Sequence, residues 1–237
     1  MIDTHCHLLP GVDDGPRTES EAVELARLLA AEDVRRIVCT PHYSAMFPTV
    51  HADAAERLAR LQPVLQTAGV QVETSLAAEL GPAAAVSASI EEIVERSIGG
   101  RYVLIEVLAD SSPAALAALF ERLADASLRT IFAHPERCRA VQRRPGVLDP
   151  LRNDGALVQV VAPSVVGRWG PAIEATAWRL LDTGRTDLLA SDAHGAARRR
   201  PHFRAACALI EDRLGSAVVE ELTERRPRDV VDGSPQR

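Results

Sequence analysis

Lysine is absent from the 237-residue chain, so all 27 basic residues are arginine. Aromatic residues make up only 3% of the sequence, and no dense run of basic residues lies beside them. With a formal net charge of −6, the chain lacks the broad basic pattern that is typical of nucleic-acid-binding proteins. We therefore expect no nucleic-acid partner.

Long apolar runs are also missing. Nowhere do about 18 apolar residues follow one another, and the N-terminus lacks the basic stretch of a signal peptide. The four cysteines, at positions 6, 39, 138 and 207, form no CxxC pair, which fits reduced thiols better than disulfides or a thiolate metal site. We expect a cytoplasmic protein without membrane insertion. The sequence is compatible with a monomer and with an oligomer.

The chain contains neither an internal repeat nor a low-complexity linker, and 46% of its residues are hydrophobic. Residues 1–237 are therefore expected to form a single domain around one core. The segment 225–237 is polar and contains Pro227 and Pro235. We expect this tail to fray.

Short aliphatic or β-branched runs alternate with longer runs rich in Ala, Leu and Glu, which is typical of β/α units around a parallel sheet. The predicted strands are residues 1–6, 35–40, 70–77, 102–107, 129–133, 156–161 and 187–191. The predicted helices are residues 19–32, 53–68, 114–126, 172–181 and 204–213. Thr18 and Glu21 have the spacing of a capping box at the start of the first helix.

This alternation fits either an open doubly wound sheet or a closed barrel. A doubly wound sheet gathers its ligand at one or two crevices, whereas here nearly every strand ends in a candidate metal ligand. The sequence therefore favours a barrel.

Two histidines, His5 and His7, lie two residues apart on the first predicted strand, so their side chains point to the same face. An isolated HxH pair is more often a surface pair than a metal site, but further donors follow at the ends of later strands. These donors are Asp14, His42, Glu79, Glu106, His134, Asp192 and His194. Because the strand ends of a barrel converge on one face, the nine side chains are expected to meet. His51 and His202 lie in predicted connections or helix starts and are interpreted as solvated.

Nine nitrogen and oxygen donors exceed the three or four protein ligands of one zinc site, so two or three divalent ions are expected. A donor set without thiolate suits several first-row metals. Mn²⁺ is the ion that we expect first, and Fe²⁺, Co²⁺ and Zn²⁺ are the alternatives.

Six segments carry a family resemblance: DTHCHLLPGVDDG, TPHY, AAELG, YVLIEV, AHPERC and SDAHG. In order and spacing they resemble the polymerase-and-histidinol-phosphatase (PHP) superfamily. Within it, the chain is most similar to the bacterial CpsB/CapC-type tyrosine phosphatases of capsule and exopolysaccharide biosynthesis, over residues 1 to about 210. The resemblance implies a distorted seven-stranded (β/α)7 TIM-like barrel, the PHP fold, with a trinuclear site that is commonly loaded with manganese.

The same resemblance implies metal roles for the nine donors and phosphate-binding roles for Arg137 and Arg199. Because Arg198, Arg199 and Arg200 are consecutive, any of the three could make the second phosphate contact. The resemblance also suggests a phosphotyrosine protein as the substrate, such as the tail of a bacterial tyrosine kinase. The segment AELGPAA stands where many relatives have a polar or tyrosine-rich segment, so substrate contacts there are expected to differ.

These features predict a metal-dependent phosphomonoester hydrolase in which a hydroxide that bridges the metal ions attacks phosphorus. The arginines would neutralise the phosphoryl oxygens. Because a phenolate leaves with a pKa near ~10, phosphotyrosine needs no obvious general acid.

Two other functions fit the same donors. One is a small-molecule phosphatase, such as an enzyme acting on histidinol phosphate, and the other is a metal-binding regulatory protein without catalysis. A thiol mechanism is rejected although Cys138 and Arg144 have the C-x5-R spacing, because the five residues between them contain no glycine to form a phosphate-binding loop.

Overall fold

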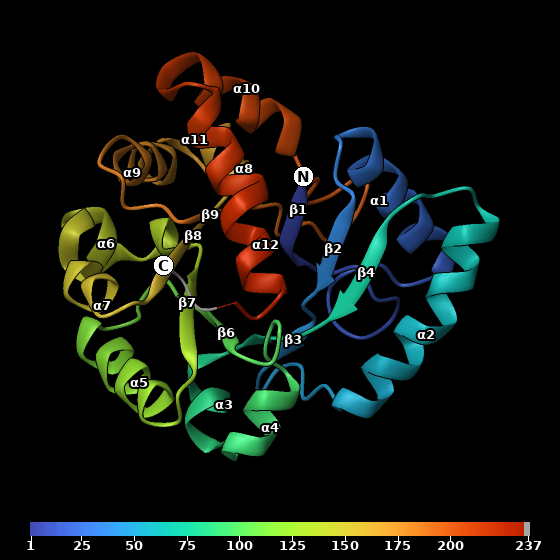
Figure 1. Cartoon of the computed structure of the whole chain (residues 1–237), viewed down its shortest axis with the longest axis horizontal. Helices are drawn as coiled ribbons and strands as arrows, with labels where there is room; N and C mark the ends of the chain where they lie inside the picture. Colours follow the sequence, from blue (N-terminus) through green and yellow to red (C-terminus); the bar gives the residue numbers. More distant parts are fainter. Residues whose placement is uncertain (235–237) are drawn as a thin grey trace.

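The computed structural model describes residues 1–234 and has an α/β architecture in which all the pairings between named strands are parallel. Figure 1 shows the strands at the centre of the molecule with helices around them. One sheet has the order β1 (Ile2–Cys6), β2 (Arg36–Cys39), β4 (Glu73–Leu76). The other has the order β3 (His42–Tyr43), β5 (Glu79–Leu80), β6 (Tyr102–Glu106), β7 (Arg129–Ala133), β8 (Leu157–Val161), β9 (Leu188–Ala190). The predicted parallel α/β class is confirmed.

Two of the seven predicted strands are interrupted, and each continues in the other sheet. β2 is followed by β3 after Thr40 and Pro41, and β4 is followed by β5 after two alanines. Pro41 has no N–H to donate, which explains a break in the ladder there. At the opposite edge, the N–H groups of His7 and Asp192 bond the carbonyl groups of Ala193 (3.0 Å) and His5 (2.9 Å), which joins the end of β9 to β1. The ladders therefore form two sheets, which are connected through β2–β3 and β4–β5 on one side and through β9 and β1 on the other.

The five long helices confirm the predicted helices to within two residues at each end. Their bounds are α1 (Glu19–Ala31), α2 (His51–Thr67), α5 (Pro113–Asp125), α9 (Pro171–Asp182) and α10 (Phe203–Leu214). In α1 the Thr18 hydroxyl accepts the N–H of Glu21 (3.2 Å), but the Glu21 carboxylate accepts the N–H of Arg17 (2.7 Å) rather than that of Thr18. The reciprocal half of the capping box is thus displaced by one residue.

Shorter helical segments fill the connections, and the sequence did not predict them because they span too few turns to show a periodic pattern. The α-helices are α3 (Pro82–Ser87), α4 (Ile90–Glu95), α6 (Arg139–Arg143), α7 (Asp149–Asn153), α8 (Ala162–Val165), α11 (Ser216–Glu220) and α12 (Arg226–Val231). The 3₁₀ turns η1 (Pro135–Arg137) and η2 (Pro145–Leu148) and the π turn η3 (Glu221–Arg225) complete them.

The core has two clusters of buried side chains. The larger one lies between strands and surrounding helices and includes Leu25 and Leu29 of α1 and Leu61 of α2. The smaller one gathers side chains from strands of both sheets, namely Val38, Leu104, Ile131, Leu157 and Leu188. The strands of the two sheets thus turn one set of side chains toward a common interior.

The chain after residue 225 does not fray as predicted. It forms α12, which crosses in front of the strands in Figure 1 and buries Val230 completely in the smaller cluster. The Tyr102 hydroxyl donates a hydrogen bond to the carbonyl group of Ser234 (2.7 Å). The polar composition led to the prediction of a frayed tail because only two side chains of this helix, Pro227 and Val230, are buried. Residues 235–237, which the prediction also covered, lie outside the described part of the chain.

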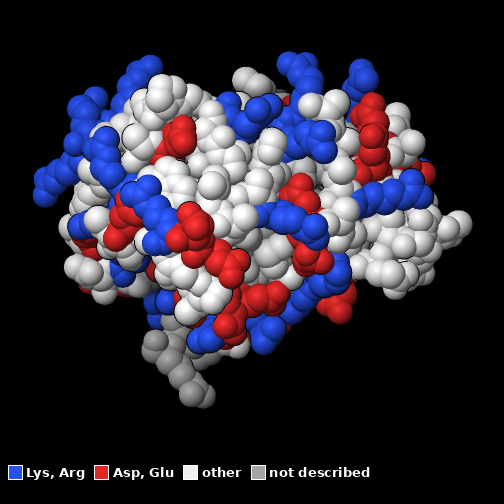
Figure 2. All heavy atoms as spheres, turned by 90° about the horizontal axis from the view of Figure 1, so that it is seen from above, with Lys and Arg blue, Asp and Glu red and all other residues white. Residues whose placement is uncertain are grey.

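Charged side chains of both signs lie next to one another over the face in Figure 2. Surface ion pairs of the protein include Arg204–Asp33 (2.6 Å) and Arg213–Asp182 (2.5 Å). Among the helices of residues 1–234, none combines the length and the apolar character needed to cross a bilayer.

The packing of the tail can be tested by truncating one side chain. Val230→Ala should lower the free energy of unfolding by about 2 kcal/mol, because it removes two buried methyl groups and leaves a cavity. Val86→Ala is the matched control, since Val86 is 62% exposed on the short helix α3. Urea denaturation of both variants measures the difference, and equal midpoints would contradict the role assigned to α12.

Candidate metal centre

All nine predicted donors lie at the C-terminal side of the strands and come together. His5 and His7 belong to the end of β1 and the residues after it, and His42 and Glu79 open β3 and β5. The side chains form four groups, and within each group the ligand atoms lie within 4.8 Å of one another. The groups are His7, Asp14, His42 and His194; His5, Glu79 and His134; His5, His7 and Asp192; and His42, Glu79 and Glu106. Overlap between these groups makes one continuous cluster.

Hydrogen bonds at Nδ1 fix the orientation of the His5 and His7 rings. His5 Nδ1 lies 2.8 Å from Gln159 Oε1, and His7 Nδ1 lies 2.7 Å from Asp13 Oδ2. Because these oxygens can only accept, each Nδ1 carries the hydrogen, and both Nε2 atoms face the cluster. The two Nε2 atoms are 3.3 Å apart.

Two carboxylate oxygens complete this inner group. Glu79 Oε2 lies 3.4 Å from Nε2 of both His5 and His7, and Asp192 Oδ1 lies 3.6 Å from both. Glu79 Oε2 is buried and has no hydrogen-bond partner in the described part of the chain. Four converging donors at this spacing, one of them unsatisfied, fit a divalent cation with nitrogen and oxygen ligands.

An outer group surrounds Asp14, which lies in the loop after β1. Its Oδ1 atom is 3.2 Å from His194 Nε2 and 3.5 Å from His42 Nε2. His194 Nδ1 donates to the carbonyl group of Asp192 (3.0 Å), so that its Nε2 atom is left facing Asp14. His42 Nδ1 lies 3.0 Å from Glu79 Oε2, which links the outer group to the inner one.

Two donors follow their strands in a left-handed backbone conformation. His134 has φ 38° and Asp192 has φ 48°, values that cost non-glycine residues about 1 kcal/mol each. Hydrogen bonds from the backbone N–H of His134 to the carbonyl group of Gln159 (2.8 Å), and from that of Asp192 to the carbonyl group of His5, hold these turns. His134 Nε2 thereby reaches Glu79 Oε1 at 2.8 Å.

The centre contains more carboxylates than guanidinium groups. Five carboxylates (Asp13, Asp14, Glu79, Glu106 and Asp192) face two guanidinium groups (Arg137 and Arg199), which leaves three surplus negative charges when the histidines are neutral. Glu79 is fully buried and Asp192 is 1% exposed. Buried charge of one sign is expensive unless cations compensate it, so the surplus also fits divalent ions.

Protons and metal ions compete for the same nitrogen atoms. Burial alone would lower the pKa of His7, but the Asp13 carboxylate raises that pKa to about 9. A metal ion that binds Nε2 must therefore displace a proton. Burial opposes ionisation of Asp192 as well, yet the charges of Arg137, His5 and Arg199 hold its pKa well below its usual range.

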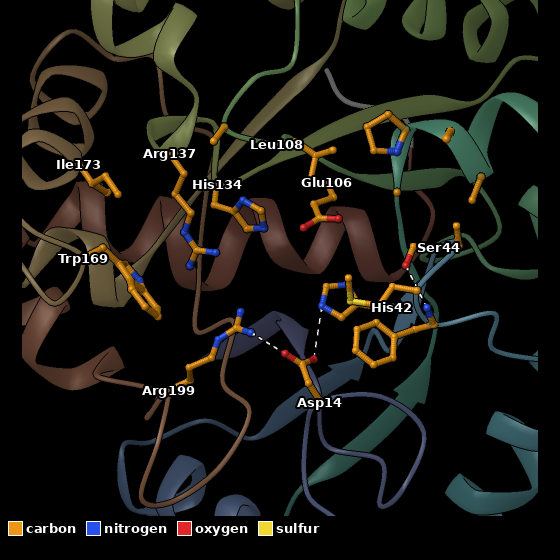
Figure 3. Close-up of a pocket in the computed structure, with 18 residues that line it drawn as sticks. Asp14, His42, Ser44, Glu106, Leu108, His134, Arg137, Trp169, Ile173 and Arg199 are labelled. Atoms are coloured by element: carbon orange, nitrogen blue, oxygen red, sulfur yellow. Dashed lines mark hydrogen bonds and ion pairs between the residues drawn. The ribbon is translucent and has the colours of Figure 1, made fainter.

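Both predicted phosphate-binding arginines point into the centre. Arg137 Nη2 lies 2.6 Å from Asp192 Oδ2, and Arg199 bonds both oxygens of Asp192 (3.0 Å) and Oδ2 of Asp14 (3.1 Å). Figure 3 shows the two guanidinium groups approaching each other beside the ring of Trp169, whose centroid lies 4.9 Å from Cζ of Arg137 and 6.0 Å from Cζ of Arg199. The side chains of Arg137 and Arg199 are 21% and 25% exposed, so part of each guanidinium group remains accessible to an anion.

A cleft of about 840 Å³ opens from these arginines and is lined mainly by apolar side chains. Met46, Phe47, Leu108, Trp169 and Ile173 line it, and Figure 3 shows Trp169 and Ile173 on the side opposite Ser44. The small residues 81–84, which follow Glu79, form part of the wall. An aryl group attached to an anion bound by the arginines would fit here.

Sequence reasoning missed several supporting residues. Asp13 accepts hydrogen bonds from His7 and from the N–H groups of Gly15 (2.9 Å) and His42 (2.9 Å), although only its neighbour Asp14 was predicted to act. A Cβ atom at Gly15 would lie 2.5 Å from the carbonyl oxygen of His7, so the DDG sequence itself was a signal for this close turn. Gln159 was signalled as the one polar residue in the strand LVQVV. No comparable signal marked Trp169.

The geometry supports the rejection of a thiol mechanism. Cys138 is fully buried, and its Sγ atom lies 3.4 Å from the carbonyl oxygen of Ser111. The five residues before Arg144 form the helix α6, so their N–H groups do not cradle a phosphate.

Parallel strands that deliver histidine and carboxylate donors to one end, with two arginines beside them, define the class of metal-dependent α/β proteins. The chain belongs to the CpsB/CapC family of capsular polysaccharide synthesis, whose family model matches residues 1–232. The tyrosine-protein phosphatase YwqE of Bacillus subtilis is 30% identical to it over 94% of this chain and 89% of YwqE. CapC of Staphylococcus aureus is 32% identical over 94% of this chain and 87% of CapC.

A solved structure agrees with this assignment. It comes from a study of YwqE and of CpsB from Streptococcus pneumoniae, described as unique metal-dependent tyrosine phosphatases. It superposes with a TM-score of 0.90 at 28% identity and covers 99% of this chain and 96% of its own.

The supporting role of Asp13 leads to a prediction. Asp13→Asn should keep the fold but lower the affinity for Mn²⁺ by about 10–100-fold, because His7 loses the carboxylate that fixes its ring and strengthens its Nε2 atom as a ligand. Isothermal titration of metal-free protein measures the affinity. Asp125→Asn, at an exposed position at the end of α5, is the control, and equal affinities of the two variants would refute the role of Asp13.

Proposed function

We propose that the chain is a metal-dependent phosphomonoester hydrolase that removes phosphate from tyrosine side chains of proteins in capsule or exopolysaccharide regulation. The observation that carries the proposal is the pair of partly exposed guanidinium groups of Arg137 and Arg199, which line the apolar cleft beside the histidine–carboxylate cluster. Membership of the CpsB/CapC family and the names of its relatives support the same reaction.

The nine donors would hold two or three divalent ions, and Mn²⁺ is the ion we propose, with Fe²⁺, Co²⁺ or Zn²⁺ as alternatives. Such ions act as Lewis acids and lower the pKa of water toward about 7. Gln159 and Asp13 keep the rings of His5 and His7 turned toward the ions.

The arginines would bind the phosphoryl oxygens through planar, charged N–H donors. Asp192 holds both guanidinium groups before substrate arrives, so little rearrangement is needed. The tyrosine ring would lie in the apolar cleft, where it is shielded from water. A phenolate has a pKa near ~10, so its departure requires little help from an acid.

We also propose that the two sheets form the distorted seven-stranded barrel of the PHP fold. The shared interior cluster and the hydrogen bonds between the end of β9 and β1 support closure. Four buried cysteines without disulfides among residues 1–234 support a reducing compartment, and we propose the cytoplasm. A phosphorylated tail of a bacterial tyrosine kinase is the proposed protein substrate.

Chelation tests the metal requirement. EDTA should abolish hydrolysis of p-nitrophenyl phosphate and Mn²⁺ should restore it, because every proposed ligand is a histidine or a carboxylate. Full turnover by protein that elemental analysis shows to be metal-free would contradict the proposal. The restored enzyme should also prefer a phosphotyrosine peptide over histidinol phosphate in kcat/KM, and the opposite preference would favour a small-molecule phosphatase.

Arg137 separates phosphate binding from metal binding. Arg137→Ala should lower kcat/KM on a phosphotyrosine peptide by about 2–4 kcal/mol of transition-state stabilisation while the metal content stays constant, because a guanidinium group cannot ligate a cation. Arg137→Lys should recover only part of the loss, since an ammonium group cannot make bidentate contacts. Arg143→Ala, which removes an exposed guanidinium group from α6, is the control. Loss of metal on Arg137→Ala, or full activity, would show that the assigned role is wrong.

A further inference from the structure

A second pocket, of about 640 Å³, adjoins the apolar cleft and is also lined by Trp169. Its own basic side chains are Arg168, Arg198, Arg200 and His202, and we call it the basic pocket. It shares Asp14, Trp169 and Arg199 with the apolar cleft, so the two pockets meet at the proposed phosphate position.

The basic pocket has a surplus of positive charge. Arg168, Arg198 and Arg200 form no ion pair within residues 1–234, whereas Arg152 and Arg204 elsewhere are paired with Asp187 and Asp33. Asp14 is the only carboxylate that lines the pocket among the described residues, and Arg199 already binds it. The nearby Glu32 is occupied by the backbone N–H of Arg204 (3.0 Å).

The loop that carries two of these arginines is tied to the metal centre. The backbone N–H of His194 donates to the carbonyl group of Arg199 (3.0 Å), and Arg199 adopts φ 52°. This turn directs Arg199 to Asp192, while Arg198 and Arg200 line the basic pocket but not the apolar cleft. Of the three consecutive arginines, Arg199 thus belongs to the metal centre, and Arg198 and Arg200 belong to the basic pocket.

We propose that the basic pocket is a second anion subsite, which binds a carboxylate or phosphate group carried by the same peptide as the scissile phosphotyrosine. The inference rests on the proposed phosphatase function. Extended peptide advances by about 3.3–3.6 Å per residue, so a side chain a few positions from the tyrosine can cross from the apolar cleft to the adjoining pocket. Released inorganic phosphate has the same chemistry and is the alternative occupant.

A comparison of two peptides tests the subsite. They contain one phosphotyrosine and are identical except that the flanking residues are Glu in one and Gln in the other. The native enzyme loaded with Mn²⁺ should have a kcat/KM on the Glu peptide that is higher by on the order of tenfold, a preference that salt weakens. In the double variant Arg168→Ala/Arg200→Ala the ratio should fall to below about twofold, because the remaining exposed arginine contributes little.

Matched controls separate this result from a general loss of charge. Arg139→Ala/Arg143→Ala removes two exposed arginines of α6 and should keep the preference for the Glu peptide. Arg168→Glu should reverse the preference in favour of the Gln peptide.

Three outcomes are decisive against particular claims. If the native enzyme hydrolyses both peptides equally well, the subsite is refuted while the phosphatase function stands. If it hydrolyses neither peptide, the proposed function itself fails. If the double variant relieves inhibition by inorganic phosphate but leaves the peptide preference unchanged, the pocket binds released phosphate and the peptide subsite is wrong.

Discussion

The burial of carboxylates at the ends of parallel strands is the constraint on which the rest of this structure depends. Glu79 and Asp192 lie among apolar strands with almost no access to water, where an uncompensated carboxylate is strongly disfavoured. The protein supplies partial compensation through Arg137 and Arg199 and turns the histidine nitrogens toward the remaining charge. This arrangement makes the cluster suitable for divalent ions and places the same two guanidinium groups where they can meet an anionic substrate.

The interrupted strands explain how so many donors reach one place. Regular parallel strands present alternate side chains to one face, and each strand therefore offers few positions near its end. The breaks after β2 and β4 start two new strands, which open with His42 and Glu79 paired in register. Glu79 consequently lies within 3.4 Å of His5, His7, His42 and His134 nitrogens, and it is the residue that links the inner and outer groups of the centre.

The sequence predicted the metal-ligand donors better than the residues that orient them. HxH spacing and the position of acidic residues after apolar runs depend on local periodicity, so His5, His7 and Asp192 could be identified directly. Asp13 and Gln159 had only the DDG sequence and a polar residue in an apolar strand as signals, and their partners lie 6 and 154 residues away, which local periodicity does not specify. The tail helix was missed because one buried valine in a polar segment carries no periodic signal. The division of the strands into two sheets was missed because it depends on which strands pair, not on local sequence.

The left-handed turns at His134 and Asp192 have a consequence for how the protein matures. They add local strain beside a cluster in which carboxylates raise the pKa values of His7 and His42 to about 9, so that protons occupy the nitrogens that cations would bind. Ligands that bind the native state alone increase its stability with the logarithm of their free concentration. Folding and metal acquisition are therefore thermodynamically linked, and the lifetime of a newly synthesised chain depends on the divalent-ion supply of the cell that makes it.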